Sequence, residues 1–77
     1  MRKDLYSAIR SYLQGNIDKH VVNVKLHTEN TVGVAEHSDH IETIEKELGI
    51  ISEYEDKLQV LDKYFSNENL KSHLLND

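Results

Sequence analysis

The chain has no cysteine, and this absence removes several kinds of chemistry at once. It can form no disulfide bond, offer no thiolate to a metal and use no cysteine nucleophile. The absence fits a reducing compartment. A core built from only 77 residues rarely supplies more than about 3–5 kcal/mol, so chains of this size usually add disulfides, a metal ion or a partner subunit. Because disulfides are excluded here, metal binding and self-association remain.

Glycine is scarce, and no long apolar run is present. The three glycines are isolated, so they cannot form a phosphate-binding loop, and no Gly-x-Ser-x-Gly motif or plausible catalytic triad occurs. We therefore predict a protein that is not an enzyme and uses no cofactor. No apolar run approaches the roughly 18 residues that a membrane span requires, and the N-terminus lacks the apolar segment of a secretory signal. We expect a cytoplasmic protein without membrane contact.

Basic charge is also in short supply, because the net charge is −5. The first 29 residues carry five basic and three acidic side chains, whereas the rest carry four basic and eleven acidic ones. A surface that follows phosphates needs clustered lysine and arginine, so we predict no nucleic-acid partner. The first half is net positive and the second half net negative, so the two halves could attract each other. The other interpretation is that the charges lie on two solvated faces.

The residues that are present predict a long helix over about 38–65, where no proline interrupts the chain. Apolar side chains recur there at alternating steps of three and four, which is a helical and not a strand period. They are Ile41, Ile44, Leu48, Ile51, Tyr54, Leu58, Leu61 and Phe65. Ser38 is a good N-cap, and Asp39 and Glu42 place negative charge at the helix N-terminus.

A first helix is predicted over about 2–29. Its apolar residues follow one another at steps of four and three, and this phase continues across Gly15. With a loop over about 30–37 and a short C-terminal helix over about 67–75, the prediction is one domain, 1–77. It is an all-α antiparallel hairpin that self-associates into a helical bundle, most simply a homodimeric four-helix bundle. We expect the oligomer or core seam to contain Ile9, Leu13, Ile17, Val24, Ile44, Leu48, Ile51, Leu58 and Leu61.

Residues 21–35 leave an alternative open. They are rich in β-branched side chains that partly alternate with polar ones, which by propensity alone suggests a β-hairpin and an α+β fold. An isolated hairpin of two strands is only marginally stable, however. We favour helix to about residue 29 followed by the loop.

Among the ionisable residues, the histidines are the best candidates for a metal-binding site. In an antiparallel hairpin turning near Gly33, facing residues have numbers that sum to about 67. This rule places His20 opposite Glu47 or Leu48, and His27 near His40. His27, His37 and His40 could ligate zinc or another divalent metal, but their spacing matches no established zinc signature. Solvated loop histidines and no bound metal are therefore the favoured interpretation.

A shallow polar and aromatic groove is a further candidate for ligand binding. Tyr12 and Tyr54 could line it together with Arg10, while Lys19 and Lys25 could meet phosphate groups. The competing interpretation is that these tyrosines are core-edge and interface residues.

Several segments carry a resemblance to known sequences. They are residues 30–39 (Asn-Thr-Val-Gly-Val-Ala-Glu-His-Ser-Asp), 44–48 (Ile-Glu-Lys-Glu-Leu), 53–58 (Glu-Tyr-Glu-Asp-Lys-Leu) and 63–65 (Lys-Tyr-Phe). Over roughly residues 16–65 the chain resembles small uncharacterised proteins of tailed phages, notably phages of marine cyanobacteria. The resemblance implies a phage origin and a host-cytoplasm setting, and it brings no activity or catalytic residue. In that group a proline often follows the loop asparagine, whereas this chain has Thr31.

These observations predict a non-enzymatic, homo-oligomeric interaction protein, and the resemblance points to a phage accessory factor that binds a host or phage protein. Its expected partner is itself, as a dimer in the simplest case, with a host or phage protein as a second partner. The alternatives are a protein that binds or sequesters a nucleotide signal, a divalent-metal-binding protein, and a virion component.

Overall fold

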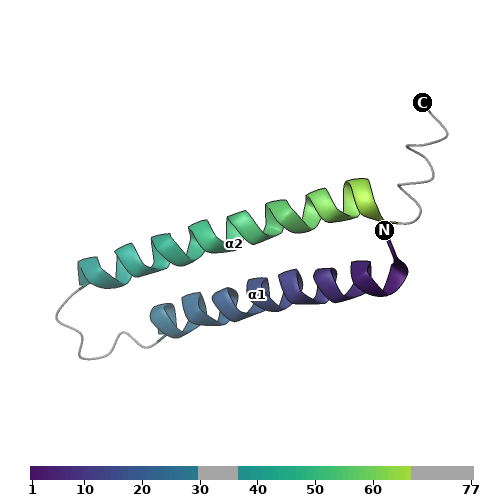
Figure 1. The fold of residues 1–77 in the computed structure, drawn as a ribbon. Helices are drawn as coiled ribbons and strands as arrows, with labels where there is room; N and C mark the ends of the chain where they lie inside the picture. The colour runs from purple at the N-terminus through teal and green to yellow at the C-terminus, as the bar shows by residue number, and fades with distance from the viewer. Residues whose placement is uncertain (30–36, 67–77) are drawn as a thin grey trace.

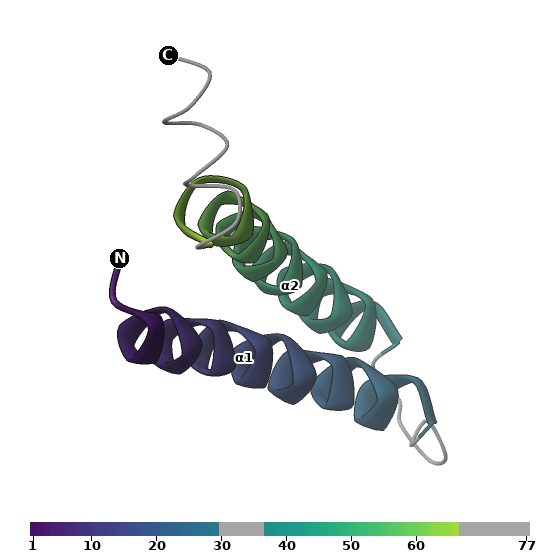
Figure 2. The ribbon, with the colours of Figure 1, turned by 90° about the vertical axis from the view of Figure 1, so that its right-hand side faces the viewer.

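Two antiparallel helices make up the described part of the protein. The computed structural model describes residues 1–29 and 37–66, except for the side chains of residues 37 and 38. Helix α1 (Lys3–Glu29) and helix α2 (His37–Phe65) lie side by side, with the start of α1 next to the end of α2 (Figures 1 and 2). The predicted all-α helical hairpin is confirmed, and its self-association stays a prediction.

The β-hairpin alternative is wrong for the part of residues 21–35 that the structure describes. Residues 21–29 belong to α1, and no strand occurs in residues 1–29 or 37–66. The helical phase prevails because it keeps Val24 on the side of α1 that meets α2, whereas a lone hairpin would bury little. Residues 30–35, and the short helix predicted over 67–75, lie outside the described residues.

Local signals at the helix ends agree with the observed boundaries. Asp4 and Asp39 lie in the first turns of α1 and α2, and Lys63 lies in the last turn of α2. Acidic groups at helix N-termini and basic groups at C-termini complement the helix dipole. Lys57 pairs with Glu53 one turn earlier, at 3.4 Å between Nζ and Oε1, which adds a few tenths of a kcal/mol.

The core is a narrow seam. Only Leu13, Ile17 and Leu61 are buried among the described residues, each at 6–7% exposure, and no side chain is completely enclosed. Five of the six other predicted seam residues are half-buried, namely Ile9, Val24, Ile44, Ile51 and Leu58. A hairpin of two helices has one layer, so each helix has one neighbour to cover its apolar stripe.

Leu48 does not belong to the buried seam of the single chain. Its side chain is 53% exposed, and Ile41, which begins the predicted stripe, is 67% exposed. The side of α2 that meets α1 instead carries His40 and Glu47, and both are half-buried. Leu48 and Ile41 each follow one of these residues directly, which turns them about 100° around the helix. The single chain therefore leaves Leu48 outside its core, because polar residues occupy two of the facing positions. The place of Leu48 in an oligomer seam stays a prediction.

Neither described helix is long and apolar enough to span a membrane.

We expect Leu13→Ala to lower the free energy of unfolding by about 2–3 kcal/mol, since the substitution removes a buried side chain from a core too thin to compensate. Leu48→Ala is the matched control, with an expected effect below about 1 kcal/mol because its side chain is exposed. Urea unfolding followed by circular dichroism, at one fixed protein concentration, measures both. Equal losses for the two variants would contradict the assignment of the seam.

The two helical glycines give a second prediction. A Cβ atom added at Gly15 or Gly49 would have no contact within 4 Å. Alanine costs less backbone entropy than glycine in a helix, so Gly15→Ala and Gly49→Ala should each stabilise the protein by about 0.5–1 kcal/mol. The same unfolding experiment tests this, and a destabilised variant would contradict the expectation.

Candidate functional site

An open groove lies between the helices at the end of the hairpin where the chain begins. Its volume is about 590 Å³. Residues from the first half of α1 and the second half of α2 line it together with Met1, which precedes α1. The lining residues are Met1, Ile9, Leu13, Glu53, Asp56, Lys57, Val60, Leu61 and Phe65. Six of these nine are apolar, so the groove is suited to apolar side chains rather than to a charged ligand.

Exposed apolar residues extend this groove along α1. Leu5 and Tyr12 are 51% and 64% exposed, and they lie four residues before and three residues after Ile9, which puts them on adjoining parts of the helix surface. We call the surface formed by Met1, Leu5, Ile9, Tyr12, Val60 and Phe65 the groove face. Val60 is 49% exposed and Phe65 41% exposed. Contiguous apolar surface of this kind typically marks an interaction site.

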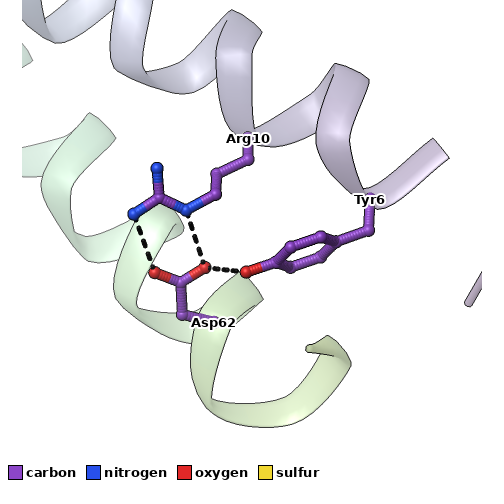
Figure 3. Close-up of polar contacts among 3 residues, drawn as sticks. All are labelled: Tyr6, Arg10 and Asp62. Atoms are coloured by element: carbon purple, nitrogen blue, oxygen red, sulfur yellow. Dashed lines mark hydrogen bonds and ion pairs between the residues drawn. The ribbon is translucent and has the colours of Figure 1, made fainter. Parts of the chain in front are cut away.

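A polar cluster joins the same end of the two helices. The Tyr6 hydroxyl donates a hydrogen bond of 2.5 Å to Oδ1 of Asp62. Arg10 donates from Nε and Nη2 to the two carboxylate oxygens of Asp62, at 3.2 and 3.3 Å (Figure 3). The hydrogen bond from Tyr6 and the Arg10 guanidinium lower the pKa of Asp62, and the same hydrogen bond raises the pKa of Tyr6. The cluster therefore holds Asp62 in its ionised form.

A second polar cluster lies nearer the loop. Nδ1 of His20 donates to Oε2 of Glu47, and Nδ2 of Asn23 donates to Oε1 of the same carboxylate at 3.2 Å. The side chains of His20 and Glu47 are only 13% and 16% exposed. The His20 contact is the main reason that the pKa of Glu47 is lowered; burial opposes this effect, and Asn23 adds to it. The predicted facing of His20 and Glu47 is confirmed.

A third polar contact joins two histidines still closer to the loop. Nδ1 of His27 lies 3.3 Å from Nδ1 of His40, and both side chains are half-buried. The rings meet edge to face, with their centroids 5.4 Å apart. The predicted proximity of His27 and His40 is confirmed. His37 is the first residue of α2, and its side chain lies outside the described residues. No group of three or more potential metal-binding side chains occurs in the described part of the chain.

The structure does not gather the five candidate ligand residues into the groove. Arg10 is paired with Asp62, and Tyr12, Lys19 and Lys25 are exposed. Tyr54 stacks on His20 at 6.3 Å between ring centroids, and Nζ of Lys57 lies 5.1 Å from the centre of its ring. None of the five lines the groove itself, and of the five only Tyr12 belongs to the groove face beside it. Their arrangement gives no particular support to a phosphate-binding pocket.

Sequence reasoning missed Asp62 and most of the groove lining. One signal was available for Asp62, because the facing rule places it opposite Tyr6. Arg10 follows Tyr6 by one turn and so reaches the same carboxylate. The groove offered no comparable signal, since Met1, Val60 and Phe65 become neighbours of Ile9 only when the two helices pack.

We expect the hairpin to lose stability as the solution becomes acidic. The pKa values of Asp62 and Glu47 are lower in the folded chain than their ordinary values, so the unfolded chain takes up protons first. The stabilisation is complete above the ordinary carboxyl pKa of about 4 and disappears as the pH falls through the folded values. Urea unfolding at pH 7, 5 and 3 tests this expectation. Asp62→Asn should show a smaller acid-induced loss than the wild type, and an identical loss would contradict the role given to Asp62.

No protein-family model, curated protein or solved structure matches the chain in comparisons of sequence and structure. The function must therefore be argued from the chemistry of these surfaces.

Proposed function

We propose that this chain is a non-enzymatic interaction protein whose groove face packs against the same face of a second copy, forming a homodimeric four-helix bundle. The observation that carries the proposal is the mismatch between core and surface. Three side chains are buried in the described residues, and two of them, Leu13 and Leu61, also line the groove. The other apolar side chains of the groove stay partly or largely exposed, namely Met1, Ile9, Val60 and Phe65.

The size of this mismatch favours a partner that is always present. Complete burial of one large apolar side chain contributes about 1.5–3 kcal/mol, and here only three side chains approach that state. Ordering the backbone of a single residue costs about 1–2 kcal/mol, so two long helices need more apolar contact than one seam offers. A second copy supplies this contact wherever the protein is made, which a rarer partner would not.

Charges at the edge of the groove are compatible with self-association. Glu53 and Asp56 are negative, and Lys57 is positive. In a twofold-symmetric interface the same patch occurs on both subunits, so each must be complementary to itself. A groove edge with both signs meets this condition, because Lys57 of each copy can meet an acidic residue of the other. An edge of one sign would instead favour a partner of opposite charge.

The wider role that we propose is that of an accessory factor in phage-infected cells, where the dimer would bind a host or phage protein in the cytoplasm. Its support is the resemblance of residues 16–65 to small phage proteins. The described residues add a compatible architecture, since a helical bundle presents long exposed helix faces to further partners.

The dimer is tested by sedimentation equilibrium or light scattering over a range of protein concentrations. The subunit mass is 8.9 kDa, and we expect the wild type to show twice that mass at micromolar concentration. Val60→Glu should shift the protein towards the monomer, because it places a charge within the proposed interface. Leu48→Glu is a matched control, since Leu48 and Val60 are exposed to similar extents, 53% and 49%, and Leu48 is not part of the groove.

Three results would overturn the proposal. One is a wild-type protein that stays monomeric even at a concentration about 100-fold above the micromolar range. The second is a Val60→Glu variant that retains the dimer mass. The third is an equal loss of dimer in Val60→Glu and Leu48→Glu, which would show that neither effect is specific to the groove face.

A further inference from the structure

The half of the hairpin next to the loop is held together differently from the rest. Among the described residues, none after Ile17 in α1 and none before Leu61 in α2 is buried. Polar contacts join the two helices in this region. One is the cluster of His20, Asn23 and Glu47, and the other is the contact between His27 and His40. A cross-link here would hold together the part of the structure with the least apolar burial.

The distance between the two histidine nitrogens equals the distance between two ligands on one metal ion. Zn²⁺ binds histidine nitrogen at about 2.0–2.1 Å in tetrahedral sites, which puts two such nitrogens about 3.3–3.4 Å apart. The Nδ1 atoms of His27 and His40 are 3.3 Å apart. The two rings come from different helices, so one ion between them would join α1 to α2.

Electrostatics give a second reason to expect a cation at this position. The two Nδ1 atoms lie at hydrogen-bond distance, so one of them donates to the other when it carries the proton. When both imidazoles carry their proton on Nε2, the two Nδ1 lone pairs lie close together and repel each other. Either a proton or a metal ion between the nitrogens removes this repulsion. A shared proton gives one hydrogen bond, whereas a metal ion uses both lone pairs and forms two coordinate bonds.

We propose that His27 and His40 form a binding site for a divalent transition-metal ion of the Zn²⁺ class, which ties the two helices together next to the loop. The sequence favoured solvated histidines, and the distance between the two Nδ1 atoms reverses that preference. The site is independent of the proposed dimer, because both ligands come from one chain. Its expected stoichiometry is one ion per chain.

The donor set determines what kind of site this is. No third histidine or carboxylate completes a cluster in the described residues, so water would fill the remaining positions. Two protein ligands give weaker binding than the four of a structural zinc site, and an ion with open positions exchanges readily. We therefore expect binding in the micromolar range that a chelator reverses, with metal-induced stabilisation of a hairpin that is already folded.

The test is calorimetric titration of Zn²⁺ into full-length protein without a histidine tag, together with thermal unfolding in excess Zn²⁺ and in chelator. We expect one ion per chain and a rise in Tm of at least about 5 °C at metal concentrations about 100-fold above Kd. His27→Gln and His40→Gln should each weaken Zn²⁺ binding at least about tenfold, because each leaves one ligand.

His20→Gln is the matched control, because it removes a half-buried histidine that contacts Glu47 and not the pair. It should bind Zn²⁺ as the wild type does. Circular dichroism in chelator shows whether each variant keeps its helices. Loss of Zn²⁺ binding is then interpreted only for variants that remain folded. Absence of Zn²⁺ binding in the wild type would overturn the proposal and leave a shared proton between the rings. Undiminished binding in both His27→Gln and His40→Gln would also overturn it.

Discussion

The fold depends on the burial of one narrow apolar seam between two antiparallel helices. Leu13 and Ile17 of α1 and Leu61 of α2 are its buried residues, and half-buried neighbours continue it in both directions. Burial of apolar surface is not directional, so this seam can bring the helices together but fixes their register only loosely. A seam with so few enclosed side chains also leaves little margin of stability, which makes the remaining surface of the hairpin important.

Polar contacts beside the seam supply the register. Asp62 accepts hydrogen bonds from both Tyr6 and Arg10, and Glu47 accepts them from His20 and Asn23. Sliding one helix by a turn would separate these partners and leave the two carboxylates without their donors, which is costly for groups that are partly desolvated. Polar residues at facing positions thus restrict the hairpin to one alignment. These polar residues also occupy positions that apolar side chains could fill, and they therefore reduce the apolar surface that the core buries.

This compromise accounts for both proposed sites. At the end of the hairpin where the chain begins, the seam remains apolar but uncovered, and a second copy would complete it across the groove face. Near the loop several facing positions are polar and no apolar side chain is fully buried among the described residues, so a metal ion between His27 and His40 would supply a cross-link where apolar burial is least. With no cysteine in the chain, self-association and metal binding are the two remaining ways to reinforce so small a domain.

The sequence by itself determined the two helices and their antiparallel pairing, because helical periodicity is local and a short connection between two long helices turns the chain back on itself. Even the facing of His20 with Glu47 and of His27 with His40 followed from counting outwards from the turn. Only the tertiary structure decided that Glu47 and not Leu48 lies towards α1, that Asp62 joins Tyr6 and Arg10, and that Val60 and Phe65 line a groove with Ile9. Those outcomes depend on how the two helix surfaces rotate against each other, and a rotation of one residue, about 100°, exchanges a buried position for an exposed one.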